Sequence, residues 1–63
     1  MHVSELTQLI GRPEAWDGKP GDSQHADLKY TVFHNDDTWQ YFVVTIRDWI
    51  VVWIGNVETV IQM

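Results

Sequence analysis

Apolar and polar residues alternate along the second half of the chain, from Asp27 onward. The stretches LKYTVFH, TWQYFVVTIR, WIVVWI and VETVIQ are rich in β-branched and aromatic residues and follow a period of two. That period is typical of β-strands, because successive side chains of a strand point to opposite faces of the sheet. Turn-forming residues separate the stretches, so the pattern predicts three or four antiparallel strands in sequence order.

The N-terminal residues follow a helical pattern instead. Ser4 is a suitable N-cap, the apolar residues Leu6, Leu9 and Ile10 lie on one side, and Gly11 followed by Pro13 ends the pattern. So short a helix does not persist alone in water. We therefore expect it to pack its apolar side on the sheet.

The segment between these two parts, residues 14–26, shows neither period and contains Gly18, Pro20 and Gly21. It is interpreted as an irregular loop with Trp16 as its anchor. The predicted fold class is therefore α+β, with a short N-terminal helix packed on a three- to four-stranded antiparallel β-meander. One domain covers 1–63, with the helix in 1–13, the loop in 14–26 and the meander in 27–63.

The expected turns set the register of the strands. A first turn at 35–38 places His34 opposite Trp39 and Tyr30 opposite Val43. A second, two-residue turn at Arg47-Asp48 is weaker, because such hairpins prefer glycine-containing pairs, and one long bent strand is the competing assignment. With the turn, Ile46 faces Trp49, Val44 faces Val51 and Phe42 faces Trp53.

This register predicts a sheet that is apolar on both faces. One face would hold Leu28, Tyr30, Val32, Tyr41, Val43, Ile50, Val52 and Ile54. The other would hold Phe33, Phe42, Val44, Ile46, Trp49, Val51 and Trp53.

A helix of two turns covers only one face of such a sheet. The second face must then be covered by the loop with Trp16, by a second copy of the chain or by a different protein. The alternative is a sheet that curls around itself and buries both faces in a monomer. Large exposed apolar patches usually mark interfaces, and Trp is enriched among their anchors. We expect Phe42, Trp49 and Trp53 to anchor a partner.

Size and composition point the same way. The chain has 63 residues, 44% of them hydrophobic, and no cysteine. A domain this small buries only about 60% of the surface of its unfolded chain, so its stability is marginal. Because the chain can form neither disulfides nor thiolate metal sites, oligomerisation or a partner remains as the additional source of stability.

The chain is acidic, with a net charge of −5. That balance argues against direct nucleic-acid binding, which needs clustered Lys and Arg. It permits docking on a basic surface that ordinarily holds nucleic acid, whereas the simpler interpretation is that the charge keeps the protein soluble. For docking, an acidic rim is expected to consist of Asp17, Asp22, Asp27, Asp36 and Asp37.

Candidate chemistry is sparse. His34, Asp36 and Asp37 lie close together, with His25 upstream, so a metal site or a general base is conceivable. The sequence HNDDT is, however, more typical of a turn. We expect no metal, no cofactor and no enzymatic activity.

No membrane segment is expected either. The longest uncharged run of the apolar region, Trp49 to Val57, has nine residues, against the roughly 20 that a spanning helix requires. The N-terminus has no signal-peptide pattern, and the absence of cysteine fits a cytoplasmic location.

These features together predict a small, acidic, non-catalytic protein-binding module. By type, though not by motif, it is similar to the phage and mobile-element inhibitors known as anti-CRISPR or anti-restriction proteins, which would dock on a basic surface of a host protein. The alternative is a homo-oligomeric structural subunit, such as a homodimer.

Overall fold

The computed structural model describes residues 1–61 and contains one helix and five strands, which confirms the α+β class. The elements are α1 (Val3–Ile10), β1 (Ala15–Gly18), β2 (Ala26–His34), β3 (Thr38–Arg47), β4 (Ile50–Ile54) and β5 (Glu58–Ile61). The last residues of the expected meander, 62 and 63, lie outside the described residues.

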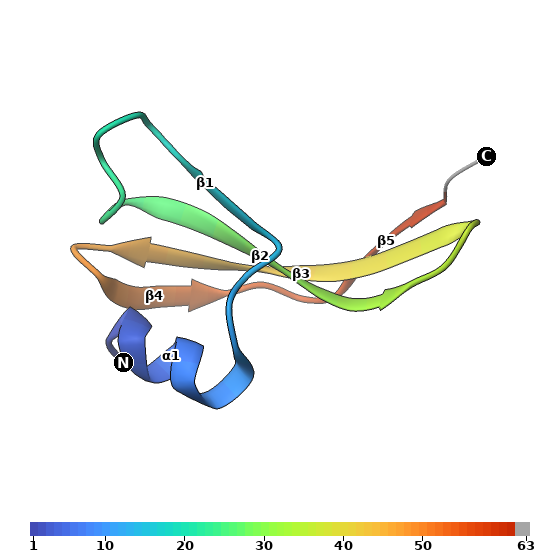
Figure 1. Ribbon diagram of the computed structural model, residues 1–63, viewed down its shortest axis with the longest axis horizontal. Coiled ribbons are helices and arrows are strands. Elements are labelled where there is room, and N and C mark those ends of the chain that lie inside the picture. Colours follow the sequence, from blue (N-terminus) through green and yellow to red (C-terminus); the bar gives the residue numbers. More distant parts are fainter. Residues whose placement is uncertain (62–63) are drawn as a thin grey trace.

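The sheet is organised around β3, a strand of 10 residues. Along one edge β3 pairs with β2, and along the other edge it pairs first with β4 and then with β5, so the order is β1-β2-β3-β4 with β5 on β3. All pairings are antiparallel. Figure 1 shows α1, β1 and β4 at one end of the molecule, while the β2–β3 turn and β5 extend from the other. We call this second end, residues 31–41 with β5, the arm.

A fifth strand lies where an irregular loop was expected. β1 forms inside segment 14–26 and pairs with the start of β2, with Trp16 opposite Leu28. The prediction of a loop was therefore wrong for Ala15–Gly18. Its four residues carry no clear alternation, and their extended conformation comes from pairing with β2 rather than from local preference.

The helix begins two residues earlier than expected, and its cap is not Ser4. His2 is the N-cap, and its Nδ1 accepts a hydrogen bond from the Ser4 amide at 3.1 Å. Gly11 ends α1 at φ 85°, a conformation that glycine adopts without steric cost. Val3 is buried on the sheet-facing side of α1, whereas Leu9, which was expected on that side, is 72% exposed.

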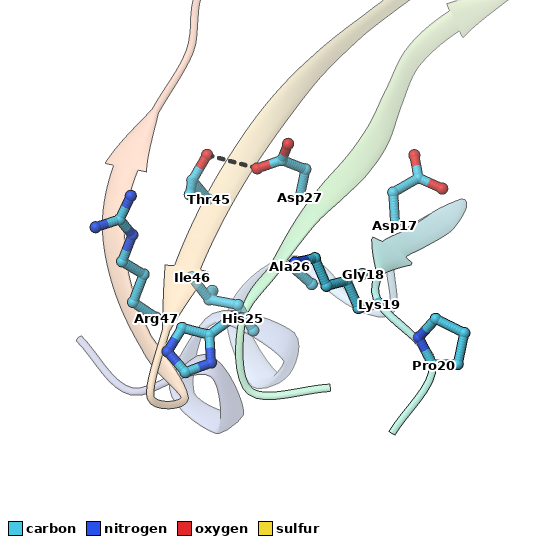
Figure 2. Close-up of a pocket in the computed structure, with 10 residues that line it drawn as sticks. All are labelled: Asp17, Gly18, Lys19, Pro20, His25, Ala26, Asp27, Thr45, Ile46 and Arg47. Carbon is cyan, nitrogen blue, oxygen red and sulfur yellow. Dashed lines mark hydrogen bonds between the residues drawn. The ribbon is translucent and has the colours of Figure 1, made fainter. Parts of the chain in front are cut away.

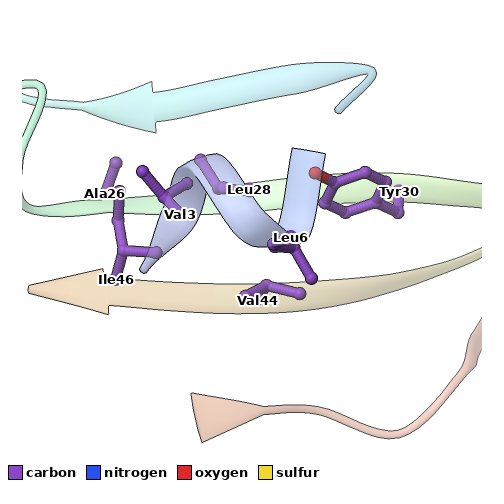
Figure 3. Close-up of a cluster of buried hydrophobic side chains, with 7 residues drawn as sticks. All are labelled: Val3, Leu6, Ala26, Leu28, Tyr30, Val44 and Ile46. Atoms are coloured by element: carbon purple, nitrogen blue, oxygen red, sulfur yellow. The ribbon is translucent and has the colours of Figure 1, made fainter. Parts of the chain in front are cut away.

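The core lies under α1, at one end of the sheet. Figure 3 shows the helix crossing the buried residues of β2 and β3. Tyr30 closes this core, because its ring stacks on Phe42 with centroids 5.5 Å apart and its hydroxyl donates to the Gly11 carbonyl at 3.0 Å. The buried residues are Val3, Leu6, Ala26, Leu28, Tyr30, Val44 and Ile46.

A β-bulge at Val32 changes the expected register between β2 and β3. His34 does lie opposite Trp39, as predicted, but Tyr30 lies opposite Phe42 rather than Val43. The extra residue in β2 moves every earlier residue of that strand to the other face. Leu28 and Tyr30 therefore join Val44 and its neighbours under the helix, and the predicted division into two faces was wrong for β2.

The β3–β4 connection is a two-residue hairpin turn, so the alternative of one long strand is excluded. The turn residues are Asp48 and Trp49 instead of Arg47 and Asp48, and both have positive φ, 54° and 65°. Arg47 thus pairs with Ile50, and a second bulge at Val52 shifts the rest of β4. The pairs predicted from the earlier turn position were wrong: Ile46 faces Val51, Val44 faces Ile54 and Thr45 faces Trp53.

The N-terminal residues continue the sheet beyond β4. The Val51 amide donates to the Met1 carbonyl at 2.8 Å, and the Val3 amide donates to the Trp49 carbonyl at 2.7 Å. This pairing satisfies backbone groups at the edge of β4 next to the turn. Over residues 1–61, no helix has the length and apolar character needed to cross a membrane.

Candidate functional site

The face of the sheet that points away from α1 has no helix or strand of residues 1–61 packed on it. We call it the open face. Alternation along β3 places its odd-numbered residues there, because Val44 and Ile46 point to the helix. The open face is formed by Lys29, Trp39, Tyr41, Val43, Thr45 and Trp53, with Asp17, Asp27 and Glu58 at its margins.

An ordered aromatic row crosses the arm side of the open face. The rings of Trp39 and Tyr41 lie with centroids 4.6 Å apart, and the Trp39 indole donates to Thr31 Oγ1 at 3.0 Å. The ammonium of Lys29 lies 5.6 Å from the centre of the Tyr41 ring, within the range of a cation–π contact. These contacts fix the orientation of the rings before any partner binds.

Tyr41 also connects β3 to β5. Its hydroxyl donates to Glu58 Oε2 at 3.1 Å. This hydrogen bond raises the pKa of Tyr41 above its ordinary value of 10.0, and desolvation and the Glu58 charge add to the effect. The raised pKa therefore keeps the phenol a neutral donor to a higher pH than an ordinary tyrosine.

Trp53 is the most exposed large side chain of the open face, at 58%. It lies opposite Thr45, and its indole ring covers Gly55 so closely that a Cβ on Gly55 would come within 2.7 Å of the ring. The glycine thus allows the ring to lie flat along the chain. A broad indole surface is presented to solvent beside Val43.

Two carboxylates oppose each other at the other end of the open face. Asp17 on β1 and Asp27 on β2 are directly paired in the register. Like charges in that position are unfavourable. Lys29 Nζ lies 3.7 Å from Asp17 Oδ2, and Thr45 Oγ1 donates to Asp27 Oδ1 at 2.8 Å, which offsets part of the repulsion.

A shallow hollow of about 610 Å³ adjoins these carboxylates. Figure 2 shows Arg47 on one side of it and Asp17 on the other, with the hydrogen-bonded pair of Asp27 and Thr45 between them. Lys19 and His25 come from the β1–β2 connection. The hollow holds both signs of charge, an arrangement that suits polar side chains of a partner better than a bare apolar ligand.

The three predicted anchors do not share one surface. Only Trp53 lies on the open face. Phe42 points to the helix side and packs half-buried against the core, and Trp49 occupies the β3–β4 turn at 38% exposure. The shifted turn and the bulge at Val52 separate residues that a continuous register would have aligned.

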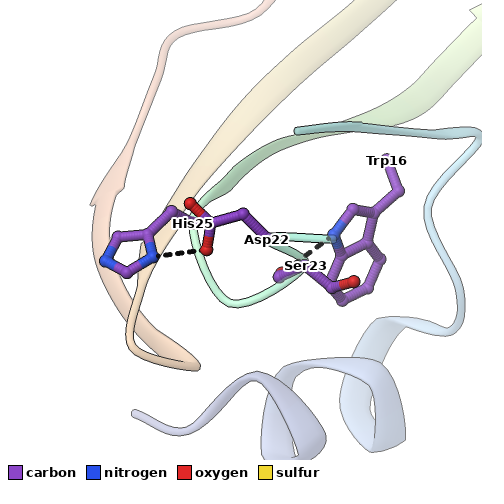
Figure 4. A network of polar contacts seen from close by, with 4 residues as sticks. All are labelled: Trp16, Asp22, Ser23 and His25. Carbon is purple, nitrogen blue, oxygen red and sulfur yellow. Dashed lines mark hydrogen bonds and ion pairs between the residues drawn. The ribbon is translucent and has the colours of Figure 1, made fainter. Parts of the chain in front are cut away.

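Trp49 belongs to a separate cluster at the helix end. Its ring lies 6.3 Å from that of Trp16, between centroids, and its amide donates to the Gln24 carbonyl at 3.2 Å. Figure 4 shows the Trp16 indole donating to the Ser23 carbonyl in the β1–β2 connection. Trp16 does anchor this segment, as expected, and Trp49 joins the same cluster.

The predicted acidic rim is divided between the two ends of the molecule. Asp17 and Asp27 border the open face, whereas Asp22 lies in the β1–β2 connection, 3.0 Å from His25 Nδ1. Asp36 and Asp37 lie in the β2–β3 turn. There Asn35 Oδ1 accepts hydrogen bonds from the Asp37 and Thr38 amides at 2.9 and 2.7 Å, the arrangement of a side-chain-stabilised turn.

Within residues 1–61, no group of three or more His, Cys, Asp and Glu side chains has metal-binding proximity. The turn holding His34, Asp36 and Asp37 therefore does not gather a ligand set. His34 instead lies at the rim of a second, smaller hollow, of about 300 Å³, with Glu14, Thr31 and Trp39.

The sequence interpretation missed Trp39, Tyr41 and Val43 as members of one surface with Trp53. Tyr41 and Val43 were assigned to the same face as Leu28 and Tyr30. The alternation in TWQYFVVTIR did place Trp39, Tyr41 and Val43 together. What the sequence lacked was a signal for the two bulges, which decide how that strand aligns with its neighbours.

Comparison with known proteins found no matching protein family, no matching curated protein and no matching solved structure.

Proposed function

We propose that the protein is a non-catalytic protein-binding module whose open face docks on a basic surface of a partner protein. The observation that carries the proposal is the uncovered sheet face with Trp53, 58% exposed, on its edge strand β4. Indole and phenol rings are the commonest hot spots of protein interfaces. The rigid rings of Trp39 and Tyr41 lose little conformational entropy on binding.

The charge of the module supports a basic partner. The whole chain carries −5, and the repulsion between the directly opposed Asp17 and Asp27 is offset only in part by Lys29 and Thr45. A lysine or arginine of the partner would relieve that repulsion and speed association. A surface that ordinarily binds nucleic-acid phosphates has this chemistry, so we further propose inhibition by competition, as in anti-CRISPR or anti-restriction proteins, in the cytoplasm of a host cell.

The experiment is affinity capture from a lysate with three forms of the immobilised chain. Wild type and Leu9→Ala, altered on the exposed side of α1, should capture the same protein, whereas Trp53→Ala should not. Loss of a hot spot costs about 2 kcal/mol, which corresponds to roughly 30-fold in affinity.

Two further measurements test whether the captured protein has a basic, nucleic-acid-binding surface. Added duplex DNA or RNA should release the captured protein, and higher salt should weaken its binding. Capture that survives Trp53→Ala would contradict the use of the open face. Capture that is indifferent to both nucleic acid and salt would contradict a basic, nucleic-acid-binding surface.

A further inference from the structure

The helix-side face of the sheet is only partly covered. α1 has 8 residues and is therefore about 12 Å long, whereas the molecule extends 37 Å. Beyond the helix, this face continues along the arm. We call this uncovered part the ledge; its residues are Phe33, Gln40, Phe42, Ile54, Thr59 and Ile61.

The ledge is apolar and continuous with the core. Phe33 and Thr59 flank Gln40 on either side of β3, and Phe42 stacks on the buried Tyr30. Phe33, Ile54 and Ile61 are 48%, 58% and 60% exposed. The hydrophobic layer that begins under α1 thus runs on into solvent.

The ledge differs from the open face in its charge. None of its six side chains is ionisable, although the chain as a whole carries −5. The open face, in contrast, includes Asp17, Asp27, Lys29 and Glu58. In a two-fold interface each patch meets a copy of itself, so a charge near the axis meets its own sign. A charge-free patch on an acidic protein suits self-association, and interface cores are depleted in charge.

The shape of the helix-side face also suits a second copy of the chain. α1 forms a step about 10 Å high on one half of the face, and stacked sheets pack about 10 Å apart. Two copies can therefore stack with their ledges face to face and their helices at opposite ends. In that arrangement the arm of one copy lies at the same height above the partner's sheet as the partner's own helix. Each arm fills the space beside the partner's helix without a clash.

We propose that two copies of the chain form a two-fold dimer through their ledges. The ledge runs from Ile61, opposite Thr38, to Ile54, opposite Val44, so it is about 20 Å long and, at the width of three strands, about 14 Å wide, or roughly 280 Å² on each copy. That is less than half of a standard interface. The dimer is therefore weak, with a dissociation constant in the micromolar range or above.

The test compares two lysine substitutions on adjacent residues of β5. Ile61 belongs to the ledge, whereas Val60 points to the open face opposite Trp39. Sedimentation equilibrium of the full chain over a wide concentration range should show a monomer–dimer equilibrium for wild type. Ile61→Lys should raise the dissociation constant at least tenfold, and Val60→Lys should leave it within about twofold.

A charge-swap experiment identifies the ledge directly. Thr59→Lys and Thr59→Glu, in the middle of the ledge where the two copies meet about the two-fold axis, should each be monomeric. Their equimolar mixture should regain dimer, because opposite charges then meet across the interface. Phe33→Lys, with Thr31→Lys on the open face as its control, repeats the comparison on β2 if the end of β5 tolerates no substitution. Circular dichroism confirms that each variant is folded.

A wild type that stays monomeric at all concentrations would overturn the proposal. So would a dimer that Val60→Lys disrupts and Ile61→Lys does not, since it would use the open face. The proposal is independent of the partner docking described above: Trp53→Ala should leave self-association intact, and Ile61→Lys should leave capture of a basic protein intact.

Discussion

The hydroxyl of Tyr41 and the carboxylate of Glu58 form a 3.1 Å hydrogen bond between directly opposed residues of β3 and β5. Together with the hydrogen bond from Gln40 Nε2 to Thr59 Oγ1, it joins the side chains of the last strand to the sheet. Because the carboxylate stabilises the protonated phenol, this contact depends on pH.

We expect Glu58→Ala to return the pKa of Tyr41 toward 10.0, because the substitution removes both the hydrogen bond and the neighbouring charge. Burial raises the pKa of Tyr30, which should not change. Tyrosinate absorbance during an alkaline titration measures both groups. Glu5→Ala, on the helix, is the control and should leave both titrations as in wild type.

The sign of the linked stability change follows from the raised pKa. A group with a higher pKa in the folded state contributes stability that is fully present below its unfolded value and is lost as pH rises through its folded value. The contact between β3 and β5 should therefore weaken above pH 10 in wild type. If Glu58→Ala showed the same alkaline loss of stability as wild type, the hydrogen bond would not be its cause.

Leu28 is completely buried under α1, and its truncation should be severe. Leu-to-Ala substitutions in cores cost about 2–5 kcal/mol, and a domain of this length has a total stability of roughly 3–9 kcal/mol. We expect Leu28→Ala to be largely or fully unfolded in urea titrations at room temperature. Leu9→Ala, at an exposed helix position, should change the free energy of unfolding by no more than about 0.5 kcal/mol.

The β3–β4 turn holds a residue other than glycine in a strained backbone conformation, and substitution by glycine should relieve that strain. Asp48 has φ 54°, in the region where residues other than glycine are strained. We expect Asp48→Gly to raise the free energy of unfolding by about 0.5 kcal/mol, the gain in the turn being partly offset by the greater freedom of the unfolded chain. A urea midpoint lower than that of wild type would contradict the assigned turn.

Gly55 controls the position of the Trp53 ring. A methyl group there would lie 2.7 Å from the indole, so the ring must move, and its exposure makes that movement inexpensive. We expect Gly55→Ala to change the near-ultraviolet circular dichroism of Trp while costing less than about 1 kcal/mol of stability. An unchanged spectrum would mean that the ring does not rest over Gly55.

The elements of the fold could largely be predicted from the sequence, because their signals are local. The period of two in β2, β3 and β4 identified strands, and Gly11 marked the end of the helix. β1 was missed because Ala15–Gly18 has no pattern of its own. It becomes a strand only through its pairing with β2.

The candidate site was harder to predict, because it depends on how the strands align. The one-residue bulges at Val32 and Val52 move side chains between faces, and no turn or glycine signal precedes them. Trp53 was predicted on the same surface as Phe42, and the structure separates them. The prediction that α1 covers only one face of the sheet does not depend on how the strands align. It agrees with the exposure of Trp53.

β3 runs the length of the molecule, but the core lies at only one of its ends. The free energy needed to open its hydrogen bonds therefore differs between its two ends. Its residues 44 and 46 are fully buried, while its first residues are covered only by strand pairing. Amide hydrogens near Val44 should exchange with deuterium only through global unfolding, whereas those near Gln40 should exchange through local fraying of the arm. Binding on either side of the arm would then appear as slower exchange there, far from the core.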